Sequence, residues 1–156
     1  MINGRLSLRQ PQWESLKILA GILEHLSLSK DADLAQSLAS IQSLYPHVED
    51  FERDFPSLCF NLATGVGKTR LMGAFISYLY VTGRSRHFFV LAPNLTIYEK
   101  LIENFTLGTS KYVFHGTNEF FKDPPRIITG ENYTEHSAVR YDACLLYTSD
   151  AADDMQ

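Results

Sequence analysis

Apolar and polar positions in the first part of the chain follow the period of an α-helix. Apolar residues recur at helical spacing from Pro11 to about Ser27, which predicts a helix there. A second helix should follow over residues 34–44, with Ser29 or Asp31 as its N-cap. Pro46 would end it. The chain is therefore expected to open with two helices.

After residue 56 the pattern changes to short apolar runs that alternate with helical periods. Helical spacing marks residues 71–79, with Gly83 as the stop, and residues 97–105, where Thr96 and Glu99 have the spacing of a capping box. An alternation of strands and helices predicts an α/β domain with a parallel sheet. The apolar runs expected to form strands are Leu58–Leu62, His87–Ala92, Lys111–His115 and Arg126–Thr129.

Composition narrows the class of protein. A chain of 156 residues with 45% hydrophobic and 21% charged residues is typical of one globular domain. No apolar run approaches the length of a membrane span, and the first residues do not resemble a signal peptide. The two cysteines cannot form a disulfide framework, which indicates a reducing cytoplasm. A net charge of −4 argues against a constitutively basic nucleic-acid binder.

A glycine-spaced turn carries the clearest chemistry. Residues 61–72 read NLATGVGKTRLM, in which Gly65 and Gly67 precede Lys68 and Thr69. Between a strand and a helix, such a turn directs backbone N–H groups at a phosphate, and glycine permits the close approach. Lys68 would reach the β- and γ-phosphates of ATP, and the Thr69 hydroxyl would bind Mg²⁺. The alternative is an accidental turn with a solvent-facing lysine.

The turn lacks the leading glycine of the general P-loop pattern, because Leu62 occupies that position. Thr64-Gly65-Val66-Gly67-Lys68-Thr69 resembles motif I of superfamily 2 helicases instead. The segment LRQPQ is similar to the L-R-x-x-Q element that precedes this motif. The resemblance implies that Gln12 contacts adenine; otherwise Gln12 is an exposed residue in the first turn of a helix.

The segment FVLAPN resembles motif Ia of the same superfamily, whose turn touches the backbone of the tracked DNA strand. This resemblance implies that Asn94 and Thr96 donate hydrogen bonds to DNA phosphates. A compatible alternative is that either residue caps its own helix. Cys59 has no such match and is expected to be an inert residue of the core.

A narrower resemblance covers about residues 8–133. The Res subunits of type III restriction enzymes are similar to the stretches FERDFPSLCFNLATGVGKTRLMGAFI and LAPNLTIYEKLIENF. The resemblance implies an incomplete RecA-like domain over residues 57–143, preceded by an N-terminal helical segment over residues 1–56 that holds the adenine contact. It further implies ATP and Mg²⁺ as cofactors, double-stranded DNA as a partner of the parent protein, and a methyltransferase subunit as its modification partner.

The last residues, 144–156, resemble the translation of a transposase adapter used in preparing sequencing libraries. They are therefore left out of the expected fold as non-native, and the chain is expected to be the N-terminal part of a longer protein. The alternative is a genuine apolar strand with an acidic tail.

Hydrolysis in this family needs an Asp-Glu motif, which the sequence lacks. The parent is expected to be an ATP-dependent helicase or translocase of a restriction system with Lys68 as a catalytic residue, and the isolated chain is expected to be inactive. The alternatives are a helicase-like motor without a nuclease, used in repair or antiviral defence, a compact P-loop kinase or nucleotide-binding protein, and a module that only binds.

Overall fold

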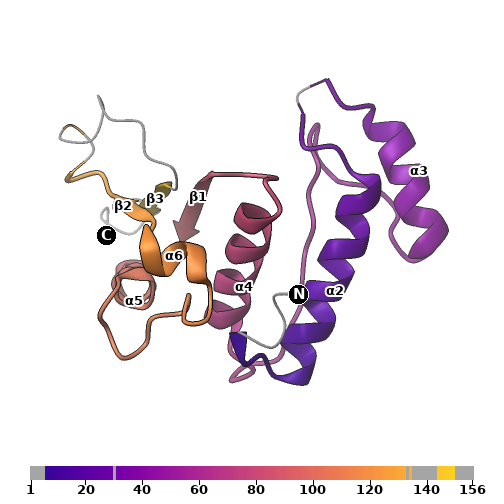
Figure 1. Cartoon of the computed structure of the whole chain (residues 1–156). Coiled ribbons are helices and arrows are strands. Elements are labelled where there is room, and N and C mark those ends of the chain that lie inside the picture. The colour runs from indigo at the N-terminus through magenta and orange to yellow at the C-terminus, as the bar shows by residue number, and fades with distance from the viewer. Residues whose placement is uncertain (1–5, 30, 133, 135–143, 150–156) are drawn as a thin grey trace. The chain divides into compact units, whose positions relative to one another are not determined.

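The computed structural model describes residues 6–29, 31–132, 134 and 144–149 (Figure 1). The chain divides into two compact units. Residues 9–68 are called the helical unit here, and residues 69–156 together with residues 1–8 are called the sheet unit. The predicted domain boundary at residue 56 stays a prediction. Among the described helices, none combines the length and apolar character needed to cross a membrane.

The helical unit contains the two predicted helices, α2 (Gln10–His25) and α3 (Leu34–Leu44). Pro11 lies in the first turn of α2, where its missing N–H costs no hydrogen bond. The N-cap of α3 is Asp33, whose carboxylate accepts a hydrogen bond from the Gln36 N–H. The predicted caps, Ser29 and Asp31, were wrong because Asp33 directly precedes the helix.

The predicted strand Leu58–Leu62 was wrong. The segment has no regular secondary structure, although its odd and even residues alternate between exposed and half-buried as in an extended chain. Cys59 is exposed, so its predicted place in the core was wrong as well. An apolar run reports that side chains will be buried, whereas a strand also requires a neighbouring strand to receive its hydrogen bonds.

The sheet unit begins with three elements close to their predicted bounds. Helix α4 (Lys68–Val81) ends before Gly83, which has a left-handed φ of +70°. Strand β1 (His87–Ala92) has the predicted bounds. Helix α5 (Leu95–Phe105) is capped by Asn94, which confirms one of the two caps considered. The capping box that begins at Thr96 was wrong, because the helix begins one residue before Thr96.

The sheet has three parallel strands in the order β1-β3-β2 (Figure 1). Strand β2 (Arg126–Ile128) falls within the predicted run, and β3 (Cys144–Ser149) lies between its two neighbours. Leaving Cys144–Ser149 out of the fold was therefore wrong, since these residues pair with both β1 and β2. The foreign origin of residues 144–156 stays a prediction, and residues 150–156 lie outside the described residues.

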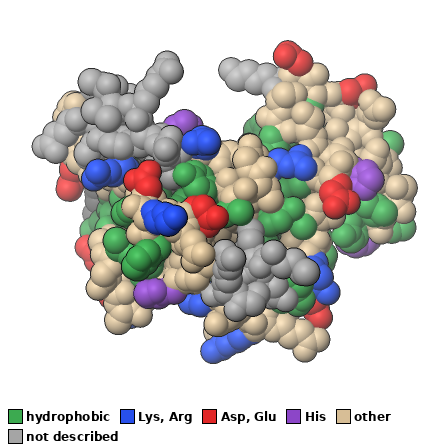
Figure 2. Space-filling model, in the orientation of Figure 1, with side chains coloured by type: hydrophobic (Ala, Val, Ile, Leu, Met, Phe, Trp, Pro, Cys, Tyr) green, Lys and Arg blue, Asp and Glu red, His purple; other side chains and the backbone are tan. Residues whose placement is uncertain are grey.

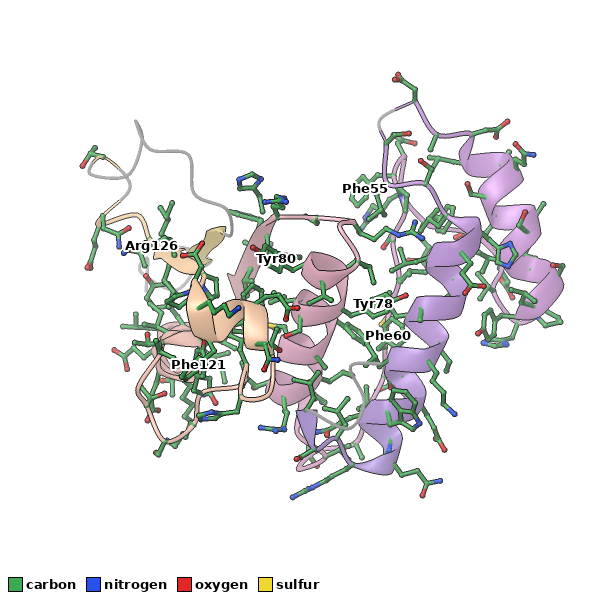
Figure 3. The ribbon with its side chains drawn as sticks, in the orientation of Figure 1. Phe55, Phe60, Tyr78, Tyr80, Phe121 and Arg126 are labelled. Carbon is green, nitrogen blue, oxygen red and sulfur yellow. The ribbon has the colours of Figure 1, made fainter. Side chains whose placement is uncertain are left out.

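The core of the sheet unit combines aliphatic side chains with a group of packed aromatic rings. The predicted strand Lys111–His115 was wrong: its middle residues are buried in a loop between α5 and α6 (Asn118–Lys122). Phe114 lies 5.1 Å from Phe105 and 4.8 Å from Phe120, measured between ring centroids. Tyr80 of α4, labelled in Figure 3, places its ring 4.6 Å from Phe120. Ring packing therefore buries the apolar run without strand pairing.

Candidate functional site: the glycine turn

The glycine turn lies between the extended segment and the first residue of α4. Gly65 and Gly67 have φ angles of +78° and +94°, a region that residues with a Cβ atom rarely adopt. A Cβ added to Gly65 would meet no atom within 4 Å, so this part of the turn is open. The two glycines are thus required by the backbone, and the turn leaves room for a ligand.

Lys68 and Thr69 directly follow the glycine turn and lie in the first helical turn of α4. The Lys68 side chain is exposed, and it forms no hydrogen bond or ion pair with any described residue. Thr69 is half-buried. The first N–H groups of a helix have no acceptor within the helix, and the helix dipole makes this end partly positive. Backbone and lysine here offer donors suited to an anion.

The side chain of Gln12 contacts the glycine turn directly, and it is buried rather than exposed. Its side chain is 2% exposed, and Nε2 donates to the carbonyl oxygens of Val66 at 2.8 Å and Gly67 at 3.0 Å. Its Oε1 accepts a hydrogen bond from the Arg9 N–H at 2.9 Å. The resemblance placed Gln12 near the nucleotide, and the structure places it against the loop backbone.

Arg9 is a site residue that the sequence analysis missed. Its Nη1 donates to the carbonyl oxygen of Gly65 at 3.3 Å. The spacing in the sequence could have predicted this role. Arg9 directly precedes α2, three positions before Gln12, so both side chains can reach the same loop. Arg70 is engaged elsewhere: its Nη2 donates to the Leu6 carbonyl oxygen at 2.6 Å within the sheet unit.

The two predicted DNA contacts lie in the sheet unit, directly after β1. The side chain of Asn94 accepts a hydrogen bond from the Ile97 N–H at 2.9 Å, which caps α5. Thr96 is exposed in the first turn of that helix. The capping role of Asn94 is thus observed, and its Nδ2 donor is not used in the cap.

No cluster of three or more His, Cys, Asp or Glu side chains suited to a metal ion occurs among the described residues. Thr69 remains the predicted ligand of Mg²⁺. With a single hydroxyl from the protein, most ligands of the ion would come from phosphate oxygens and water, an arrangement common for Mg²⁺.

Comparison with known proteins identifies the same family as the sequence motifs. The family model for the Res subunit of type III restriction enzymes matches residues 5–150. The chain is 40% identical over 70 residues to a probable type III restriction-modification enzyme HindVIP Res subunit from Haemophilus influenzae. That match covers 40% of this chain and 13% of the relative, so the chain spans only a small part of the relative's length. No solved structure matches.

The matched region includes the glycine turn, Gln12, and the strand and helix around Asn94. Proteins of this family have the RecA-like helicase fold, in agreement with the mixture of helices and parallel strands seen here. The chain belongs to the family of type III restriction enzyme Res subunits.

Proposed function

We propose that the chain binds the phosphates of ATP at the glycine turn and is the nucleotide-binding part of an ATP-driven DNA motor. The observation that carries this proposal is the backbone of the turn, in which Gly65 and Gly67 take left-handed φ angles immediately before α4. The helix begins with Lys68, whose side chain pairs with none of the residues that the structure describes. A turn of this kind concentrates N–H donors and a positive charge at one point.

The described residues fit a triphosphate. The N–H groups of Val66, Gly67 and Lys68 donate to no other described residue, so they are available to phosphate oxygens. Lys68 Nζ would bind the β- and γ-phosphates and lower the cost of charge developing between them. These residues bind and orient the substrate.

Mg²⁺, when bound with ATP, neutralises charge on the β- and γ-phosphate oxygens. In this chain Thr69 would orient the ion through its hydroxyl oxygen. The family's Asp-Glu motif, which would supply the second metal ligand and position water, is absent from the sequence. We therefore expect this chain to bind nucleotide without turning it over.

Adenine recognition by Gln12 is the role that the family resemblance implies, and it can be separated from phosphate binding. Both hydrogens of its Nε2 already bind loop carbonyls, and the side chain is buried. An adenine contact would therefore require Gln12 to release at least one of these carbonyls. The energetic cost of that release makes base recognition testable apart from phosphate binding.

For the parent protein we propose an ATP-dependent helicase or translocase that moves on double-stranded DNA in the cytoplasm, as the restriction subunit of a type III system with a methyltransferase partner. Asn94 and Thr96 would contribute neutral donors to a DNA phosphate. On the face drawn in Figure 2, the described Lys and Arg side chains lie apart from one another and do not form one basic patch.

The test compares Lys68→Ala with Lys122→Ala, which removes an exposed lysine from α6. We expect Lys68→Ala to weaken ATP binding by roughly tenfold or more, because it removes a charge-assisted contact, and Lys122→Ala to leave it unchanged. Calorimetry measures both. Equal ATP affinity in the Lys68→Ala and unsubstituted chains would contradict the proposal. In the full-length parent, Lys68→Ala should abolish ATP hydrolysis.

A further inference from the structure

Three consecutive carbonyl groups of the glycine turn are held from the start of α2. Arg9 Nη1 donates to the Gly65 oxygen at 3.3 Å, and Gln12 Nε2 donates to the Val66 and Gly67 oxygens at 2.8 and 3.0 Å. All of these residues belong to the helical unit. The side chains of Arg9 and Gln12 thus fix the orientation of three adjacent peptide groups.

A hydrogen bond that fixes the carbonyl group of one residue also fixes the direction of the N–H group of the next residue. In a planar trans peptide, the C=O of one residue and the N–H of the next point in opposite directions, and the described residues contain no cis peptide bond. When the Gly65, Val66 and Gly67 oxygens face Arg9 and Gln12, the N–H groups of Val66, Gly67 and Lys68 face the opposite way. Adjacent N–H groups aimed together form an anion-binding nest.

The hydrogen-bonding capacity of Gln12 is largely used in this arrangement. A carboxamide has two donor hydrogens, and each of them serves one loop carbonyl. Its oxygen accepts from the Arg9 N–H, which ties Gln12 to the residue that holds Gly65. Because Gln12 is 2% exposed, loss of these bonds would leave buried polar groups without partners.

We propose that Gln12, together with Arg9, is a positioning residue that orients the phosphate-binding N–H groups of Val66, Gly67 and Lys68, so that its effect on affinity does not depend on the base. This inference rests on the proposed phosphate site. It differs from the adenine contact implied by family resemblance, because loop and base compete for the same Nε2 atom.

The experiment uses a ligand that has no base. Binding of ATP and of inorganic tripolyphosphate is measured by calorimetry for the unsubstituted chain and for Gln12→Ala. Positioning predicts that both ligands lose affinity by the same factor, on the order of tenfold. If only ATP loses affinity while tripolyphosphate binds unchanged, Gln12 reads the base and the inference is overturned. Unchanged binding of both ligands overturns it too.

The control is Gln42→Ala. Gln42 Nε2 also donates to two consecutive loop carbonyls, those of Val48 at 3.1 Å and Glu49 at 2.8 Å, in the same helical unit. This substitution should leave the affinity for both ligands unchanged. A loss equal to that of Gln12→Ala would show a general effect of loosening the unit and would overturn the inference.

A second variant guards against failure of Gln12→Ala to fold. Arg9→Ala removes an exposed side chain and one of the three loop contacts. It should weaken ATP and tripolyphosphate equally, and by less than Gln12→Ala. Without ligand, both variants should also shift the backbone amide resonances of Val66 and Gly67, and unmoved resonances would contradict positioning. Failure of the unsubstituted chain to bind ATP would instead count against the proposed function.

Discussion

The hydroxyl oxygens of Ser77 and Thr117 lie 3.0 Å apart inside the sheet unit, where Thr117 donates to Ser77. The two residues are 0% and 5% exposed. Thr117 directly precedes α6, but its hydroxyl does not cap that helix. The hydrogen bond therefore fastens the start of α6 to α4.

Ser77→Ala should lower the free energy of unfolding by about 1–3 kcal/mol, because it leaves the buried Thr117 hydroxyl without its acceptor. Chemical denaturation measures the change. The double variant Ser77→Ala/Thr117→Val removes both partners and should cost less than the sum of the single variants. Additive losses would show that the two hydroxyls do not interact.

Gly73 of α4 gives a second prediction, because Val113 packs directly against it. A Cβ atom at Gly73 would lie 2.7 Å from Val113 Cγ2 and 2.9 Å from Val113 Cβ. Gly73→Ala should therefore lower the thermal unfolding temperature, with a cost of about 1–3 kcal/mol from overpacking that exceeds the helix-propensity gain of up to ~1 kcal/mol.

Gly21→Ala in α2 is the matched control. Its added Cβ would lie 3.5 Å from Tyr45 Oη, an ordinary contact, so only the gain in helix propensity should remain. Gly21→Ala should leave the unfolding temperature unchanged or raise it. If both substitutions had the same effect, close packing at Gly73 would not be its cause.

Asn94 permits a test that separates capping from DNA contact. Asn94→Ala removes the cap seen in the hydrogen bond from the Ile97 N–H and should cost ~1 kcal/mol of stability. Asn94→Asp preserves the cap, since a carboxylate accepts the same bond and suits the helix N-terminus. In the full-length parent it should still weaken DNA binding, because it repels phosphate.

Fluorescence anisotropy with double-stranded DNA measures this effect, and thermal unfolding checks that α5 is retained. Asn94→Asp with unaltered DNA affinity would mean that Asn94 serves α5 alone.

Tyr112 predicts loss of stability at high pH. Burial raises the pKa of its hydroxyl from 10.0 to about 12, and the side chain is 3% exposed. The folded protein therefore keeps the proton where the unfolded chain has released it. The stability contribution is complete below pH 10 and is lost as the pH rises toward about 12, by about 2–3 kcal/mol in all.

Denaturation at a series of pH values measures this loss, with Tyr112→Phe as the reference. The variant lacks the titrating hydroxyl, so its stability should fall less steeply above pH 10. If the stability of the two proteins fell with pH along parallel curves, residues other than Tyr112 would cause the loss of stability.

Local signals in the sequence were enough to predict five elements, namely α2, α3, α4, β1 and α5. Helical spacing and flanking residues depend on near neighbours, so each element could be predicted without knowing the fold. The caps were less certain, because Asp33 and Asn94 each compete with other suitable residues within a few positions.

Strand pairing depends on distant residues and was predicted less well. Leu58–Leu62 and Lys111–His115 have the composition of strands, but neither is paired as one. Conversely, Cys144–Ser149 was set aside by its resemblance to a foreign sequence, yet it forms the middle strand. The short helix α6 has only five residues and left no periodic signal.

The glycine turn was predicted from its residues, and the importance of Gln12 from family resemblance. The contacts of Gln12 could not be predicted, because a carboxamide suits a base edge and a peptide carbonyl equally well. Only the fold decides which partner it meets.

The side chain that holds the Val66 and Gly67 carbonyl groups is a carboxamide, which neither gains nor loses a proton over the ordinary range of pH. These two hydrogen bonds should thus survive unchanged from mildly acidic to mildly basic solution. Any change in the shape of the turn over that range would have to arise from groups other than Gln12.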